Sequence, residues 1–213
     1  DAAKAMRLFF QHPQLDFRSL ATTFLDPRKR VIEYPHAPAA PLALVAVPTT
    51  SGTGSEVTPF AVISDPERGR KVPLYDHSLT PDIAILDPEL VRGLPAAITA
   101  DTGLDALTHA LEAVVSVFAS EYTDALALQA ARLIFEHLPR AVRDGGDLEA
   151  RTRLHNAACM AGLAFANAFV GVNHALAHAL GARFHLPHGR ANAVLLPYVV
   201  RYNASLPSKF MPF

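Results

Sequence analysis

The chain has 213 residues, half of them hydrophobic and 18% charged, and its formal net charge is −1. This composition is typical of a globular protein with one large or two small domains, and the near-neutral charge without a dense Lys/Arg stripe argues against a nucleic-acid partner. No uninterrupted apolar run reaches the length of a membrane span, and the single cysteine, Cys159, excludes an intrachain disulfide and indicates a reducing, cytoplasmic compartment.

The first forty residues predict two helices and a loop. Helical patterns cover residues 1–11 and 16–24, and a Pro/Ala-rich stretch at 36–41 predicts a loop. The chain begins with Asp1 rather than Met, and it ends at Phe213 without a clear terminal element. We therefore expect it to be a piece of a longer protein.

Short apolar runs between residues 42 and 86 predict strands. The run at 42–47 ends at Pro48, and its length and β-branched residues predict a strand buried on both faces of a parallel sheet. Three further strands are expected at 60–63, 71–75 and 82–86. Pro73 predicts that the segment at 71–75 lies at a sheet edge or is irregular, because proline cannot donate to the strand ladder.

A run of small polar residues follows the first of these strands. Residues 49–56 read TTSGTGSE, which predicts a loop, named the hydroxyl loop below. A loop after the carboxyl end of a buried strand is where open α/β sheets bind ligands, and hydroxyl and N–H groups suit a ribose, an amide or a phosphate. The pattern matches neither a P-loop nor GxGxxG, so an ordinary turn stays an equal alternative.

After about residue 90 the pattern becomes helical and rich in Ala and Leu. Helices are expected near 99–118, 121–139, 147–169, 172–183 and 190–203. The change in pattern predicts a domain boundary at 93–97. We expect an α/β domain over residues 1–95 and an all-helical domain over residues 96–213 that is incomplete at its C-terminal end.

Carboxylate and imidazole side chains recur with helical spacing in the second half. Asp105 and His109 are four residues apart, as are His174 and His178, so each pair points from one helix face. His188 is expected in a loop after the second of these helices. One carboxylate and three or four imidazoles would suit a divalent first-row transition metal. Packing within Ala-rich helices is the alternative, and the absence of an HExxH pattern argues against hydrolysis.

Five longer stretches carry a family resemblance. They are DAAK at 1–4, FLDPRKRVIEYP at 24–35, PTTSGTGSEVTPFAVISD at 48–65, GLDALTHALEAVVSVFASEYTDALAL at 103–128, and NHALAHALGARFHLPHGRANAVLLP at 173–197. Through them the chain resembles the iron-containing, group III alcohol dehydrogenases, and more narrowly the alcohol dehydrogenase part of bifunctional aldehyde–alcohol dehydrogenases. The resemblance implies a dehydroquinate-synthase-like fold, with a partial α/β nucleotide-binding domain on a parallel sheet followed by an all-α metal-binding domain.

The resemblance also implies roles for individual residues. The implied metal ligands are Asp105, His109, His174 and His188, and His178 is implied as the catalytic residue beside nicotinamide and substrate. The implied nucleotide contacts are Thr49, Thr50 and Thr53, together with Asp1, Thr58, Phe60, Val62 and Lys71. Asp101 and Asn173 depart from the expected family pattern. The remaining histidines, His12, His36, His77, His137, His155 and His185, are expected to be structural or solvent-facing.

The implied activity is interconversion of short-chain aldehydes and primary alcohols by hydride transfer with NAD(H). The implied metal is Fe²⁺, although the ligand set equally accepts Zn²⁺, and the residue that selects NAD over NADP is not in this chain. The alternatives are a zinc-type polyol or semialdehyde dehydrogenase and a piece that mainly supplies a filament-assembly surface. A homo-oligomer is expected, filamentous in the full-length relatives, and the isolated piece is expected to bind metal but no cofactor.

Overall fold

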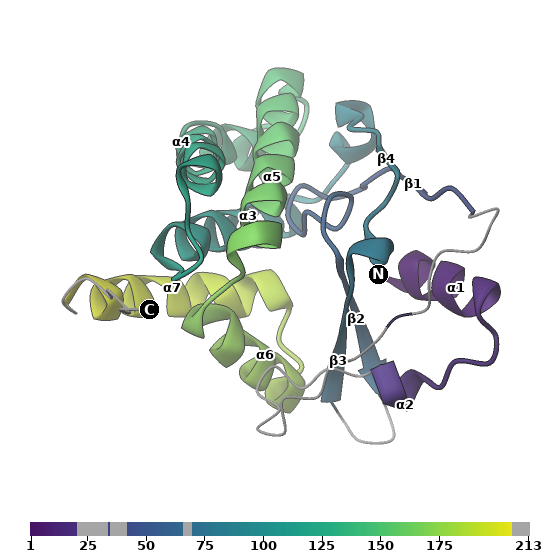
Figure 1. Ribbon diagram of the computed structural model, residues 1–213. Coiled ribbons are helices and arrows are strands. Elements are labelled where there is room, and N and C mark those ends of the chain that lie inside the picture. Colours follow the sequence, from purple (N-terminus) through teal and green to yellow (C-terminus); the bar gives the residue numbers. More distant parts are fainter. Residues whose placement is uncertain (21–33, 35–41, 66–69, 206–213) are drawn as a thin grey trace. The chain divides into compact units, whose positions relative to one another are not determined.

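The computed structural model describes residues 1–20, 34, 42–65 and 70–205, without the side chains of residues 18, 64, 65, 70 and 71 (Figure 1). The chain forms two compact units. The α/β unit comprises Asp1–Ala46 and Ser55–Ile85, and the helical unit comprises Val47–Gly54 and Leu86–Phe213. The predicted loop at 36–41 and the end of the predicted helix at 16–24 lie outside the described residues.

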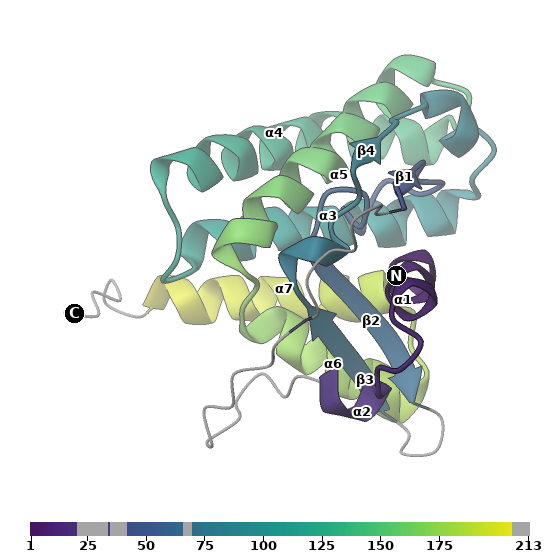
Figure 2. The same cartoon turned by 45° about the vertical axis from the view of Figure 1, so that its right-hand side comes forward.

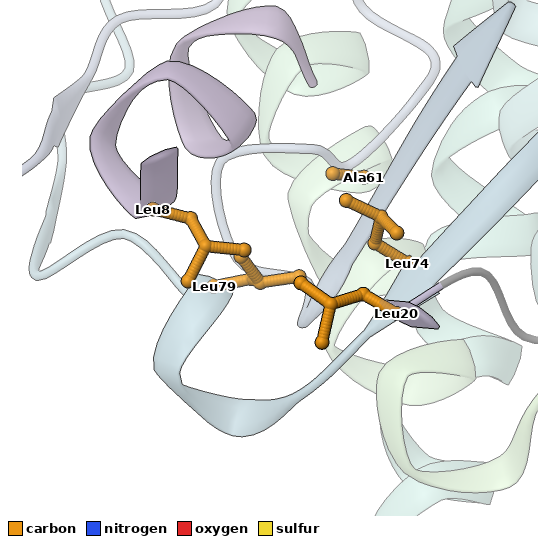
Figure 3. Close-up of a cluster of buried hydrophobic side chains, with 5 residues drawn as sticks. All are labelled: Leu8, Leu20, Ala61, Leu74 and Leu79. Carbon is orange, nitrogen blue, oxygen red and sulfur yellow. The ribbon is translucent and has the colours of Figure 1, made fainter. Parts of the chain in front are cut away.

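The α/β unit is built from short elements around a small apolar core. Its helices are α1 (Ala2–Gln11) and α2 (Phe17–Leu20), its strands are β1 (Val45–Ala46), β2 (Phe60–Asp65), β3 (Arg70–Tyr75) and β4 (Ile83–Ala84), and η1 (His77–Leu79) is a 3₁₀ turn. One buried residue from each of five elements contributes to the cluster of Leu8, Leu20, Ala61, Leu74 and Leu79 (Figure 3). This cluster fastens the two helices to the β2–β3 hairpin.

Strands β1 and β4 pair in parallel, as expected for a parallel sheet, with Val45 opposite Ile83. The predicted strand at 42–47 is shorter than expected, and the expectation that it is buried on both faces is wrong. Val45 is 47% exposed and Ile83 is 52% exposed. Among the described residues the pair has no third strand beside it, so its apolar side chains stay uncovered.

Strands β2 and β3 pair antiparallel, which the sequence did not indicate. Pro73 lies opposite Val62 in this two-stranded hairpin. Both strands of such a hairpin have a free edge, and the edge position predicted for the Pro73 strand is therefore confirmed among the described residues.

The helical unit contains five long helices and the 3₁₀ turn η2 (Pro88–Val91) among its described residues. The helices are α3 (Ala96–Val115), α4 (Glu121–Arg143), α5 (Leu148–Ala168), α6 (Val172–Phe184) and α7 (His188–Ser205). All five match a predicted helix within a few residues. Local signals set several of their ends: Ser120 and Thr123 form a capping box at α4, and Asp147 caps α5.

Helices α3, α4 and α5 run side by side, and α7 packs against α3 and α6 (Figures 1 and 2). Small residues allow the close approach: Ala110, Ala127 and Ala161 are fully buried. A Cβ on Gly103 would meet the end of the Leu138 side chain, so glycine leaves room for this leucine where α4 crosses α3. The result is a scaffold of helices at fixed separations.

A buried arginine fastens the start of α3. Arg151 on α5 is 2% exposed, and it donates to Oγ1 of Thr99 (2.6 Å) and to the carbonyl oxygens of Leu94 (3.0 Å) and Gly145 (3.1 Å). These bonds bind the segment after η2 to the helical unit. The domain boundary proposed at 93–97 stays a prediction.

No single helix of the described residues is both long and apolar enough to cross a membrane. The pair α5 and α6 meets the length and composition criteria only when taken together, and it is bent by 105°.

Candidate metal centre

A carboxylate and two imidazoles meet inside the helical unit. Asp105 and His109 come from adjacent turns of α3, and His174 comes from the first turn of α6. All three are buried, and one ligand atom from each lies within 4.8 Å of the others. Asp105 and His109 lie on the same face of α3 because they are four residues apart, which is about one helical turn.

His188 faces the same carboxylate from a third helix. Its Nε2 lies 3.5 Å from Oδ1 of Asp105. The loop position expected for His188 is wrong, because it is the first residue of α7. Part of the side chain is accessible (29%), whereas that of His174 is almost fully buried. His188 thus closes the cluster on its more accessible side.

The electrostatics of the cluster favour the metal-binding protonation states. Burial by itself would raise the pKa of Asp105, but the neighbouring His109, His188 and His174 hold it below the usual value. Burial lowers the pKa of His109 to about 3, so this ring is neutral near pH 7. A charged carboxylate and a neutral imidazole are the forms that bind metal ions.

Glu112 orients His174 from behind. Its Oε2 accepts a hydrogen bond from Nδ1 of His174 (2.6 Å), and its two oxygens also accept from the backbone N–H groups of Asn173 (2.7 Å) and His174 (3.3 Å). Because a carboxylate only accepts, Nδ1 carries the proton, and the lone pair of Nε2 points toward Asp105, 3.8 Å away. A Cβ on Gly171 would lie 2.8 Å from Oε1 of Glu112, so glycine leaves room for this carboxylate.

Two asparagines continue this network on the other side. Nδ2 of Asn192 donates to Oδ1 of Asp105 (2.6 Å) and lies 3.2 Å from Nε2 of both His174 and His188. Nδ2 of Asn173 donates to Oδ1 of Asn192 (2.9 Å), which fixes the orientation of that amide. Both asparagines are fully buried. The departure at Asn173 is thereby explained by its contact with Asn192.

Sequence reasoning missed Glu112 and Asn192. A signal for each was present, because Glu112 lies three residues after His109 and Asn192 lies four residues after His188, both on shared helix faces. The other departure, Asp101, forms a paired contact with Arg190 (3.1 and 3.2 Å). It links α3 to the start of α7.

Aromatic stacking fixes the ring of His109. Its face lies 4.3 Å from the ring of Phe165 and 4.5 Å from that of His174, with interplanar angles of 17° and 20°. Among the described residues, its buried Nδ1 has no hydrogen-bond partner, a costly arrangement for a polar atom. One of its two ring nitrogens lies within 4.8 Å of ligand atoms of Asp105 and His174, so a ring held in place beside two further donors suits a metal site.

His178 lies next to the cluster but is not one of its three mutually close residues. Its ring centroid is 4.8 Å from that of His188 and 6.5 Å from that of His174. It is half-buried, so the side chain is accessible beside the cluster. Its catalytic role stays a prediction.

The predicted cofactor contacts fall in both units. In the helical unit, Thr49 and Thr53 are exposed and Thr50 is half-buried. In the α/β unit, the predicted contacts are Asp1, Thr58, Phe60, Val62 and Lys71. Lys71 lies on β3 opposite Ser64, and its side chain is outside the described part of the chain.

Four of these α/β residues gather at the start of α1. The carboxylate of Asp1 accepts from Oγ of Ser55 (3.0 Å) and from the backbone N–H of Val62 (3.2 Å). The buried Lys4, which sequence reasoning overlooked, donates from Nζ to the carbonyl oxygens of Thr58 (2.6 Å) and Phe60 (2.8 Å). Their contact with a nucleotide stays a prediction.

Known proteins match both parts of the chain. A family described as iron-containing alcohol dehydrogenase matches residues 1–88, and the C-terminal part of the Fe-containing alcohol dehydrogenase family matches residues 99–211. The chain belongs to the iron-containing alcohol dehydrogenase family. Membership implies Fe²⁺ and NAD(H), and the buried Asp105, His109 and His174 fit the metal in donor type and protonation.

Individual relatives agree with this family. An aldehyde-alcohol dehydrogenase of Streptococcus pneumoniae is 56% identical over 98% of this chain and 23% of its own length. A 1-propanol dehydrogenase of Salmonella typhimurium is 60% identical over 76% of this chain and 44% of its own length. The chain thus spans about a quarter to a half of these relatives.

Solved structures share the fold. The iron-containing alcohol dehydrogenase of Thermococcus thioreducens matches with a TM-score of 0.84 and 40% identity, over 96% of this chain and 51% of that structure. A 1,3-propanediol oxidoreductase matches equally well by TM-score (0.84), with 44% identity over 93% of this chain and 49% of that one. The α/β-plus-helical fold class predicted from the sequence is confirmed.

Proposed function

We propose that the protein interconverts short-chain aldehydes and primary alcohols with a bound divalent iron and NAD(H). The buried cluster of Asp105, His109 and His174 carries this proposal. Relatives named as aldehyde-alcohol, 1-propanol and butanol dehydrogenases support the substrate class.

We assign the metal to Asp105, His109, His174 and His188. A divalent iron held there would act as a Lewis acid toward the substrate oxygen, while NAD(H) carries the hydride. Three neutral imidazoles and one carboxylate leave a divalent site with net positive charge, which suits an oxygen that gains negative charge. Glu112 keeps His174 in the tautomer that this assignment requires.

His178 is the proposed proton relay. It is half-buried beside His188, and an imidazole exchanges protons readily near pH 7. Replacement of His178 by Ala should slow turnover while metal content is kept. Loss of the metal would instead make His178 a ligand.

Two experiments test the proposal. Metal analysis of anaerobically purified protein should find about one iron per chain, and NADH oxidation should proceed with acetaldehyde or propanal. If the protein contains iron but does not oxidise NADH, the metal assignment stands, and the chain is a metal-binding piece that does not use the cofactor. Absence of metal binding in a folded protein would overturn the proposal.

Two further candidates have specific tests. A zinc-type polyol or semialdehyde dehydrogenase would bind Zn²⁺ in preference and reduce longer or acidic aldehydes in a substrate panel, since the ligand set itself accepts either ion. A cytoplasmic homo-oligomer that assembles into filaments is also proposed. Electron microscopy and light scattering of the purified protein would detect it.

A further inference from the structure

Within the helical unit, a buried hydrogen bond joins the hydroxyl loop to helix α5. Oγ of Ser51 lies 2.9 Å from Nδ1 of His155, which projects from α5. Ser51 is 7% exposed and His155 is 2% exposed. The bond is therefore shielded from bulk solvent, and its loss leaves a buried polar group unpaired.

The backbone of the loop approaches the same helices closely. A Cβ on Gly52 would lie 2.7 Å from Cβ of Thr102 on α3, and a Cβ on Gly54 would lie 2.6 Å from Cα of Gly162 on α5. Gly54 also has a φ of +60°, which favours glycine. One side of the loop is therefore in direct contact with α3 and α5.

The other side of the loop presents the threonines. Thr49 and Thr53 are exposed, and Thr50 is half-buried. Ser51 and Gly52, between them, are buried. The loop thus has an anchored side and a side that is available to a ligand.

The hydrogen bond to Ser51 satisfies only one of the two ring nitrogens of His155. Among the described residues its buried Nε2 has no hydrogen-bond partner, an unfavourable state that an apolar residue of similar size would avoid. Burial, opposed by the more distant charge of Asp87, lowers the pKa of His155, so the ring is neutral. A neutral ring pairs with a hydroxyl without burying a charge.

We infer that His155 is a positioning residue that anchors the hydroxyl loop through Ser51 and thereby sets the affinity for the nicotinamide cofactor. This inference rests on the proposed function, since it requires the loop to contact NAD(H). It assigns a role to a histidine that the sequence pattern left as structural.

The test compares two buried histidines of the helical unit. His155→Leu removes the bond to Ser51. His137→Leu is the matched control, because His137 on α4 is 4% exposed, its Nδ1 has no hydrogen-bond partner among the described residues, and its Nε2 lies near Glu136 of its own helix. His155→Asn is the conservative variant, because an Asn amide places a nitrogen close to the position of Nδ1.

The readouts are the Kd for NADH, measured by fluorescence titration, and the metal content. We expect a rise in Kd of about five- to tenfold for His155→Leu, as for one lost hydrogen bond. His155→Asn and His137→Leu should stay within about twofold of the parent, with metal content unchanged in all variants. Ser51→Ala combined with His155→Leu should be no worse than His155→Leu alone. Equal Kd values for His155→Leu and His137→Leu would overturn the inference.

Amide hydrogen exchange separates this inference from the proposed function. Exchange at residues 49–54 should be faster in His155→Leu than in His137→Leu, with or without NADH. If the parent protein does not bind NADH, the cofactor part of the proposed function and the inferred effect of His155 on cofactor affinity both fail, and faster exchange then supports only the anchoring of the loop. Equal exchange in both variants refutes the anchoring.

Discussion

The helical unit and the α/β unit use their buried polar groups differently. In the helical unit, buried side chains contact one another across helices, as Asn192 does with Asp105 and Glu112 does with His174. In the α/β unit, the buried Lys4 donates to backbone carbonyl oxygens of the chain before and within β2. Inside a helix the backbone groups bond one another, so side chains are needed by the backbone mainly at helix ends, as Glu112 is at α6, and are otherwise available to build a site. Short strands and loops instead require side chains to satisfy the backbone.

The largest effect should follow from removing a ligand in the helical unit. Asp105→Ala should lower metal affinity by more than about 100-fold, since changes to residues behind the ligands already cost 10- to 100-fold. Turnover should fall with it. Glu136→Ala is the control, because Glu136 lies on the exposed face of α4, where its pair with Arg132 contributes little. Similar metal content in the two variants would remove Asp105 from the ligand set.

A smaller effect is expected from the carboxylate behind His174. Glu112→Gln keeps the size of the side chain but weakens its hold on Nδ1, and we expect metal affinity to fall about 10- to 100-fold. Glu136→Gln on the exposed face of α4 should have no effect. Competition with a chelator measures both. Unchanged affinity in Glu112→Gln would mean that packing alone orients His174.

Replacing either asparagine should speed the dissociation of the metal, with a larger effect for Asn192 than for Asn173. Asn192→Ala removes the direct contact with Asp105, and we expect metal to dissociate about tenfold faster. Asn173→Ala acts only through Asn192, so an effect of about threefold is expected. The double variant should resemble Asn192→Ala, because the two residues form one chain of hydrogen bonds. Additive effects would show that Asn173 acts independently.

Lys4 should produce the smallest change, confined to stability. Burial lowers the pKa of Lys4 from 10.5 to about 8. The unfolded chain then holds more protons above pH 8, so stability rises from about pH 8 toward 10.5. The gain between pH 8 and 9 should be about 1 kcal/mol in urea unfolding followed by circular dichroism. Lys4→Met should lack this rise, and a parallel pH profile in both proteins would contradict it.

Much of the helical unit could be predicted because its signals are local. Ala/Leu periodicity, the Ser120 cap and the Asp147 cap lie in the sequence of the helix that they specify. The spacing of Asp105 and His109 likewise specifies a shared helix face. His188 was misplaced because Gly181 and Pro187 marked a helix end but not the start of the next helix at His188 itself.

The α/β unit was less predictable because strand pairing is not local. The antiparallel β2–β3 hairpin and the exposure of β1 depend on which strands lie beside each other. Family resemblance supplied the roles that spacing left open, including the choice of His174 over His178. The contacts of the hydroxyl loop and of the α/β residues with a nucleotide stay predictions.

The sequence by itself determined the helices of the second half, the presence of a parallel sheet and the position of Asp105 and His109 on one helix face. Periodicity and caps act within a few residues, so a linear pattern suffices for them. Only the tertiary structure decided that Glu112 orients His174, that Asn192 joins Asp105, and that His155 holds Ser51. The two residues of each contact are between 62 and 104 positions apart in the sequence. They become neighbours only when the helices pack, and no local sequence pattern encodes that packing.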